Sequence, residues 1–200
     1  DEVCEEMMEL YNKDKAIVFN TLQMYRHDRL DFLKSAYERA VKKNIYLGIK
    51  FVRGAYMEKE RKRAEDMGYT DPINPDKAAT DNLYNEGLKF TVEHIDRISV
   101  FNGTHDELSN SLLTELITKK GLAKNDDRIW FSQLYGMSDN ISFNLAHEGY
   151  NVAKYVPFGP VKHVLPYLIR RAEENTAVAG QTSRELDLVS RERKRRKTAK

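Results

Sequence analysis

Residues 46–53 read Tyr46-Leu47-Gly48-Ile49-Lys50-Phe51-Val52-Arg53, a short apolar and β-branched run between stretches with helical periodicity. A run of this kind predicts a buried strand. Similar runs recur at 16–20, 97–101, 128–131 and 152–156. Helical patterns follow them, at 28–43, 57–66, 75–95, 106–119, 139–148 and 161–175. Parallel strands joined by crossover helices produce this alternation, so the expected fold class is α/β.

Two α/β topologies fit such an alternation. A doubly wound sheet would be expected to carry a glycine-rich phosphate turn after an early strand, and no G-x-G-x-x-G or G-x-x-x-x-G-K-[ST] motif occurs. Polar or small residues instead close several strands, at 20–23, 53–56, 103–105 and 133–136. In a (β/α)8 barrel of the TIM type, the active site lies at that rim. The barrel is therefore the expected architecture.

A closed barrel needs eight strands, and the sequence shows five runs that could form them. The chain opens with a helical pattern at 3–11, of the sort that follows a strand already made. We expect the chain to supply about five β/α units, with a missing N-terminal barrel portion before Asp1. A start at Asp1 rather than methionine also indicates a fragment or a processed form.

The composition indicates a globular chain without a membrane span. Its 200 residues are 40% hydrophobic and 10% aromatic, enough for one substantial core. The single cysteine, Cys4, excludes an internal disulfide framework and fits a reducing compartment. No apolar run approaches the roughly 20 residues of a membrane span, so an intracellular location is expected.

Positive charge gathers at the C-terminus. The chain has 33 basic and 31 acidic residues, and positions 184–200 hold eight of the basic and three of the acidic ones. The run at 191–197 could touch anionic lipid or nucleic acid, although such runs are more often solvated helix ends. We therefore divide the chain into a barrel portion at 1–180 and a basic C-terminal helix or tail at 181–200.

The helix expected at 161–175 separates packing from chemistry. Helical spacing gathers Tyr167, Arg170, Arg171 and Glu174 on one arc. The opposite stripe, expected to face the core, consists of Val161, Leu165, Leu168, Ile169 and Ala172. Two neighbouring guanidinium groups repel one another unless an anion lies between them, and a planar carboxylate fits their geometry best. The alternative is a solvated helix face on which Arg170 and Glu174 form an exposed i,i+4 pair.

Lys50 and Arg53 place two cations in or beside an apolar strand, and buried cations need partners. The partner is either an anionic or polar cofactor or an acid from the absent strands. Gln23 and Gln133 lie at equivalent strand ends, where an amide suits the hydrogen-bonding edge of a flavin or nicotinamide ring. His105 either contacts a ligand or makes a structural hydrogen bond.

Metal and nucleophile chemistry are not expected. The five histidines show no H-E-x-x-H motif or close pairing, and one cysteine cannot build a thiolate site. No G-x-S-x-G motif occurs, and Cys4 lies far from any expected strand end. Redox chemistry suits this rim of amides, tyrosines and cations, because a bound organic cofactor supplies the reactive atom itself.

Several segments carry a family resemblance. Lys50-Phe51-Val52-Arg53-Gly54-Ala55-Tyr56 resembles the K/R-L-V-K/R-G-A-Y segment of proline dehydrogenases. Residues 155–160 and 167–175 resemble that family's Y-x-P-x-G and Y-L-x-R-R-x-x-E-N segments. Further matches at 19–25, 103–106 and 133–137 fall in the family's order, so the resemblance spans nearly the whole chain.

The resemblance implies a flavin-dependent barrel of proline catabolism, which oxidises L-proline to 1-pyrroline-5-carboxylate by hydride transfer to FAD and passes the electrons to a membrane quinone. By position, Arg170 and Arg171 would hold the proline carboxylate, and Glu174 would bind at the flavin and steady both arginines. The proline ring would be walled by Tyr155, Tyr167 and Leu134. The remaining FAD-site residues would be Gln23, Lys50, Arg53, Ala55, Thr104, His105 and Gln133. The family's last helix lies across the barrel mouth.

The resemblance also bears on substrate, location and completeness. Related hydroxyproline dehydrogenases look to carry a smaller residue in place of Tyr155, so proline is the expected substrate and the hydroxyproline enzyme the alternative. A quinone acceptor implies the bacterial inner membrane face or the mitochondrial inner membrane or matrix. The basic tail offers a membrane contact there, and nucleic acid is not expected.

The family's early strands supply a lysine and an aspartate that this chain lacks, so the 200 residues alone are expected neither to hold flavin stoichiometrically nor to turn over proline. An inactive barrel fragment with an interaction tail is the remaining alternative.

Overall fold

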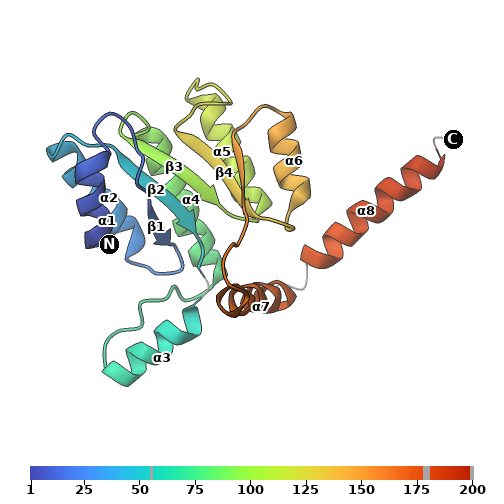
Figure 1. The fold of residues 1–200 in the computed structure, drawn as a ribbon, viewed down its shortest axis with the longest axis horizontal. Helices are drawn as coiled ribbons and strands as arrows, with labels where there is room; N and C mark the ends of the chain where they lie inside the picture. Colours follow the sequence, from blue (N-terminus) through green and yellow to red (C-terminus); the bar gives the residue numbers. More distant parts are fainter. Residues whose placement is uncertain (55, 178–180, 199–200) are drawn as a thin grey trace.

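The structure, a computed structural model, describes residues 1–54, 56–177 and 181–198, without the side chains at 170–177, 181–185 and 188. Within these residues the elements follow in the order α1 Glu2–Tyr11, β1 Asn20–Gln23, α2 Arg29–Lys42, β2 Leu47–Val52, α3 Met57–Met67, α4 Lys77–Glu93, β3 Ile98–Gly103, α5 Glu107–Lys119, β4 Ile129–Leu134, α6 Asp139–His147, β5 Val152–Tyr155, α7 Val161–Ala177 and α8 Gln181–Thr198 (Figure 1). Every helix expected after a strand is present and begins and ends within two residues of its predicted position.

The five strands form one sheet in the order β1-β2-β3-β4-β5, and each neighbouring pair is parallel. The order never reverses, so the sheet lacks the switch point that defines a doubly wound fold. Sequential parallel strands with a helix after each are the repeating unit of a β/α barrel. The prediction of barrel units rather than a doubly wound sheet is confirmed.

Helices cover one face of the sheet, and alternate strand residues fill the core beneath them. Ile49 and Phe51 of β2 are fully buried, and the Phe51 ring lies 5.7 Å from the Tyr84 ring of α4. Gly87 of α4 keeps the helix close, because a Cβ there would lie 3.0 Å from the Phe51 ring. Side chains alternate along a strand, so Lys50 belongs to the opposite face.

The first strand differs from its prediction. The apolar run was expected to pair at 16–20, but β1 is Asn20–Gln23. The backbone of the run is hydrogen-bonded by fully buried Asn12 instead, whose Oδ1 accepts the N–H groups of Ile17 and Val18 at 2.9 and 2.8 Å. Phe19 then packs edge-on against Phe101 of β3, with ring centroids 5.0 Å apart. A side-chain cap of this kind leaves no periodic signal in the sequence.

The seventh helix lies beyond the carboxyl ends of the strands, not along the sheet (Figure 1). The expectation that Val161, Leu165, Leu168 and Ile169 face the core is therefore wrong, because these side chains remain 42–74% exposed. Ala172, the last member of that stripe, is outside the described side chains. The helical period was predicted correctly, but α7 lies at the rim, and the apolar side chains of its described part are not covered by the core.

Candidate functional site

The predicted site residues of the strands meet at the carboxyl edge of the sheet. Gln23, Leu134 and Tyr155 each end a strand, β1, β4 and β5 respectively. Gln133 is the last but one residue of β4, and Arg53 and Thr104 come directly after β2 and β3. Parallel strands present their carboxyl ends on one side, so topology alone brings these groups together. The sequence prediction that the chemistry lies on this rim is consistent with their placement.

Lys50 is a rim cation that has no acidic partner among the described side chains. Its Nζ lies 5.5 Å from the centroid of the Tyr155 ring, a cation–π contact. The residues that the structure describes offer it no hydrogen bond or ion pair, and burial lowers the pKa of its ammonium. The Tyr155 ring in turn packs edge-on against Tyr167 of α7, with centroids 6.1 Å apart. A row of contacting side chains thus runs from β2 to α7, through Lys50, Tyr155 and Tyr167.

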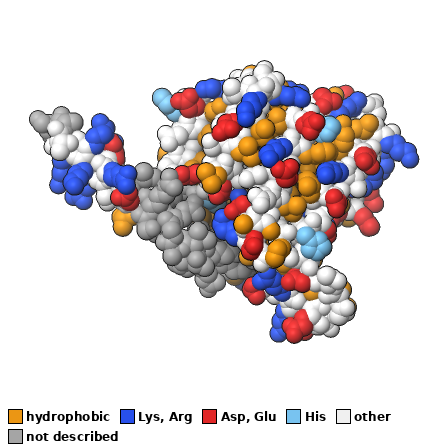
Figure 2. All heavy atoms as spheres, turned by 180° about the vertical axis from the view of Figure 1, so that it is seen from behind, with side chains coloured by type: hydrophobic (Ala, Val, Ile, Leu, Met, Phe, Trp, Pro, Cys, Tyr) orange, Lys and Arg blue, Asp and Glu red, His pale blue; other side chains and the backbone are white. Residues whose placement is uncertain are grey.

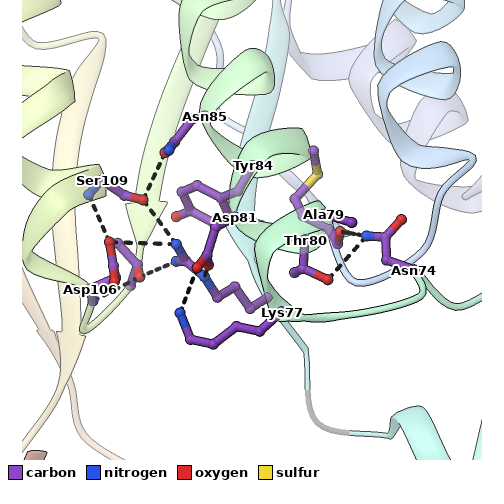
Figure 3. A network of polar contacts seen from close by, with 12 residues as sticks. Asn74, Lys77, Ala79, Thr80, Asp81, Tyr84, Asn85, Asp106 and Ser109 are labelled. Carbon is purple, nitrogen blue, oxygen red and sulfur yellow. Dashed lines mark hydrogen bonds and ion pairs between the residues drawn. The ribbon is translucent and has the colours of Figure 1, made fainter.

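Arg53 is held differently, by acids of this chain's own helices. Its Nε donates to Asp81 Oδ1 at 2.7 Å, and its Nη2 lies 3.6 Å from Asp106 Oδ1. Its remaining donors reach Thr104 Oγ1 at 2.6 Å and Ser109 Oγ at 2.9 Å. Figure 3 shows Asp81, Asp106 and Ser109 converging on this point. The acids come from α4 and the cap of α5, not from a strand outside the chain.

Sequence reasoning missed the acids of this network. Asp81 lies one turn into α4, where Lys77 Nζ also donates to its Oδ2 at 2.5 Å. Asp106 caps α5 by accepting the Ser109 backbone N–H at 2.8 Å. Helices that follow parallel strands begin near the rim where the next site residues lie, so an acid one turn into α4 was the available signal.

Two hydrogen bonds join the loop after β3 to β4 and to the turn that precedes α6. Gln133 is 2% exposed, and its Nε2 donates to the Thr104 carbonyl at 3.1 Å. His105 Nδ1 lies 2.9 Å from Ser138 Oγ. Ser142 Oγ completes the Gln133 amide by donating to its Oε1 at 2.9 Å. The structure therefore links Gln133 to Thr104, the residue before His105, and gives His105 a structural hydrogen bond.

Gln23 leaves a buried acceptor unused. Among the described residues, its Oε1 is the buried side-chain polar atom without a hydrogen-bond partner. Such an atom loses its water without compensation, which costs about 1–3 kcal/mol. The neighbouring backbone is closely approached, because a Cβ on Gly54 would lie 2.5 Å from this oxygen and Gly54 has a φ of 101°. An acceptor of this kind suits a ligand that brings an N–H or O–H donor.

Four predicted site positions lie outside what the structure describes. Ala55 falls in the gap between residues 54 and 56, and the side chains of Arg170, Arg171 and Glu174 belong to the undescribed part of α7. Their assignments therefore stay predictions. The described neighbour on the same helix, Tyr167, lies against Tyr155 at the rim.

A model of the family "Proline dehydrogenase" matches residues 1–184. The chain belongs to the proline dehydrogenase family. It is 41% identical over 96% of its length to proline dehydrogenase 1, mitochondrial, of Drosophila melanogaster, covering 30% of that protein. It is 42% identical over 92% of its length to the Homo sapiens protein of the same name, covering 31% of it. The family resemblance seen in the motifs is confirmed.

Solved structures extend the likeness to the fold. Proline utilization A from Bdellovibrio bacteriovorus, in a crystal structure of the form inactivated by N-propargylglycine, superposes with a TM-score of 0.79 and 29% identity. The match covers 87% of this chain and 18% of that one. The five parallel β/α units are therefore part of a proline dehydrogenase barrel, as expected. The chain spans about a third of the length of the curated relatives named above.

The basic end of the chain forms α8, which projects from the rest of the molecule (Figure 1). Lys and Arg side chains gather on its outer half in the view of Figure 2. Several are paired within the helix: Arg191 with Asp187 at 2.7 Å, and Arg195 and Arg196 with Glu192 at 2.7 and 2.9 Å. Over the described residues, no helix combines the length and apolar character needed to cross a bilayer.

Proposed function

We propose that this chain carries flavin-contacting and substrate-contacting residues of an enzyme that oxidises L-proline to 1-pyrroline-5-carboxylate. The observation that carries the proposal is Lys50, a desolvated cation at the rim with an aromatic neighbour and no acid among the described residues. Membership of the proline dehydrogenase family supplies the reaction class. When bound, FAD would supply the redox chemistry by accepting a hydride from proline.

The rim residues fit a flavin in their donor and acceptor chemistry. The unused Gln23 oxygen would accept from an N–H group of the ring, and Lys50 would place a positive charge beside an electron-rich ring. The same side would be lined by Thr104, His105 and Gln133. Hydrogen bonds already fix the loop after β3, which carries the first two, and the amide of Gln133 in β4. Arg53 would line the site, but its positive charge would act weakly on the flavin, because Asp81 and Asp106 lie beside its guanidinium. Ala55 would complete the FAD site.

The substrate side would be formed by α7 and the ends of β4 and β5. Tyr155 and Tyr167 are already in contact there, and Leu134, the last residue of β4, is 9% exposed. Together they would wall the proline ring. Arg170 and Arg171 would bind its carboxylate bidentately, and Glu174 would steady their guanidinium groups, as the family motif implies. The carboxylate anchor would orient the ring so that its reactive carbon meets the flavin.

A flavin spectrum of the intact protein tests the reaction. We expect the intact protein, as distinct from these 200 residues alone, to hold FAD, and we expect its oxidised absorption band to bleach when L-proline is added without oxygen. Hydroxyproline is the comparison substrate, and a higher kcat/KM for proline would support the substrate assignment. A bound flavin that stays oxidised with both compounds would overturn the proposed reaction.

A quinone is the electron acceptor we propose, with the protein working at the bacterial inner membrane face or at the mitochondrial inner membrane or matrix. The mitochondrial relatives support the second location. The exposed basic helix α8 would add an electrostatic contact to anionic lipid. We expect salt-dependent binding to anionic vesicles that disappears when residues 191–200 are removed. Binding that survives this deletion would show that another surface contacts lipid.

A further inference from the structure

Ser138 and His105 join two loops that sequence places far apart. His105 follows β3, and Ser138 is the N-cap of α6 after β4, yet His105 Nδ1 and Ser138 Oγ lie 2.9 Å apart. Ser138 is 2% exposed, so its hydroxyl lies in a dry environment where a hydrogen bond is strong. The bond occupies Nδ1, so any polar contact of the imidazole with a ligand is made through Nε2.

Ser138 adopts a backbone conformation that glycine would adopt more easily. Its φ of 50° and ψ of 43° lie in the left-handed region, and the other described non-glycine residue with positive φ is Asn44. A residue with a Cβ costs more there than glycine does. The conformation is fixed by α6, because the Ser138 carbonyl accepts the N–H groups of Ile141 and Ser142, each at 3.1 Å. The hydroxyl is what a serine adds at this position.

A second link runs parallel to this one. Ser142 of α6 donates to Gln133, and Gln133 donates to the Thr104 carbonyl, one residue before His105. The first turn of α6 thus holds Gln133 through Ser142 and His105 through Ser138. Both rim groups are oriented from the same rigid turn, which limits the rotation of the imidazole.

We propose that Ser138 is a positioning residue for His105: its hydroxyl fixes the orientation of the imidazole at the cofactor side of the rim. The consequence for FAD rests on the proposed function, in which His105 lines the flavin site. His105 would meet the cofactor with Nε2, and Ser138 would act on FAD through that ring. Loss of the hydroxyl would remove this contact to the imidazole without altering any residue that touches FAD.

The test compares two substitutions of the same backbone type. Ser138→Gly removes the hydroxyl and relieves the left-handed conformation, so the variant is expected to fold. Asn44→Gly makes the matching change at the turn after α2, before β2 and away from the rim. Both measurements use the intact protein. The ring nitrogens of His105 are observed by ¹⁵N NMR without FAD, and the Kd for FAD is then measured by titration. Ser138→Asn, which tolerates the same backbone and retains hydrogen-bonding groups, serves as the rescue variant.

We expect Ser138→Gly to move the His105 Nδ1 resonance and to weaken FAD binding about threefold to tenfold, the loss of one buried hydrogen bond. Asn44→Gly should change neither, and Ser138→Asn should restore part of the affinity. An unchanged Nδ1 resonance in Ser138→Gly overturns the positioning role whatever happens to FAD. If His105→Ala binds FAD as tightly as the unsubstituted protein, the flavin-site assignment of His105 fails, while the NMR result still decides the role of Ser138.

Discussion

Arg53 Nε lies 2.7 Å from Asp81 Oδ1, so the residue that follows β2 is held by the first turns of α4. The same guanidinium lies over the buried Tyr84 ring, 4.4 Å from its centroid. The two cations of this segment therefore differ in kind. Arg53 has carboxylates beside it and stacks on an aromatic ring, whereas Lys50, three residues earlier, carries its charge against Tyr155 alone among the described residues.

Asp81→Ala should destabilise the fold at the rim. It leaves a partly buried guanidinium without its closest carboxylate, and the Arg53 and Asp81 side chains are 22% and 27% exposed. Hydrogen bonds between charged groups contribute roughly 1.5–3 kcal/mol, and partial exposure reduces this to about 1–2 kcal/mol. Thermal unfolding should show a Tm lower by about 2–8 °C. Lys77→Ala is the control, since it removes only the exposed partner of Asp81 and should shift Tm little.

The Asp81 pair should also make stability depend on acid pH. Burial by itself would raise the pKa of Asp81, but hydrogen bonds and charge from Lys77 and Arg53 outweigh it and hold the pKa below its ordinary value. A carboxylate with a lowered folded-state pKa stabilises the fold above its unfolded value, about 3.9, and loses that effect as pH falls through the folded value. The difference in unfolding free energy between the unsubstituted protein and Asp81→Asn should be constant above about pH 5 and shrink below pH 4. A difference that persists unchanged in acid would contradict this role.

Lys50→Met should raise stability and lower activity together. Burial lowers the pKa of Lys50, which means that the folded state disfavours its charged form. A methionine of similar shape removes that penalty, and we expect a gain of roughly 0.5–2 kcal/mol. The gain should be full at neutral pH and decline as pH rises toward about 10.4, where the unfolded lysine also loses its proton. Proline oxidation should fall at the same time if the cation serves the flavin.

Lys154→Met is the matched control for that change. Lys154 of β5 donates to the Met137 carbonyl at 2.7 Å and to Asp139 Oδ1 at 2.8 Å, so its charge is compensated. The same substitution there should lower stability. If both substitutions lower the unfolding free energy in denaturant titrations, Lys50 has a compensating partner in solution. The interpretation of Lys50 as an uncompensated cation would then be wrong.

Strand order and helix limits followed from the sequence because they depend on local periodicity. The register of β1 could not be predicted in this way, since it depends on Asn12, whose side chain accepts hydrogen bonds from backbone groups five and six residues away. The acidic partners of Arg53 could not be predicted either, because they lie 28 and 53 residues after it and come close to it only when the β/α units pack side by side. The apolar stripe of α7 was recognised but placed wrongly, because a periodicity shows which residues share a face and not what covers it.

Arg170→Lys and Arg171→Lys should each raise the KM for proline sharply. A lysine keeps the charge but not the planar fork that binds a carboxylate with two parallel hydrogen bonds. Loss of that geometry corresponds to about 2–3 kcal/mol, or roughly 30-fold to 150-fold in KM. Steady-state kinetics of the intact protein measures it, with Arg193→Lys on α8 as the control that should leave KM unchanged. A normal KM in both rim variants would contradict the carboxylate assignment.

Tyr155 should set the choice between proline and hydroxyproline. Its side chain is half exposed at the end of β5 and is braced by Tyr167, so it forms a firm wall at the rim. Tyr155→Ser removes the ring and opens room for a hydroxyl group, which should raise kcat/KM for hydroxyproline relative to proline about tenfold or more. Tyr155→Phe keeps the wall and should keep the preference for proline. An unchanged ratio in Tyr155→Ser would mean that Tyr155 does not contact the substrate ring, and the ratio in Tyr155→Phe shows whether the hydroxyl of Tyr155 or its bulk decides the selectivity.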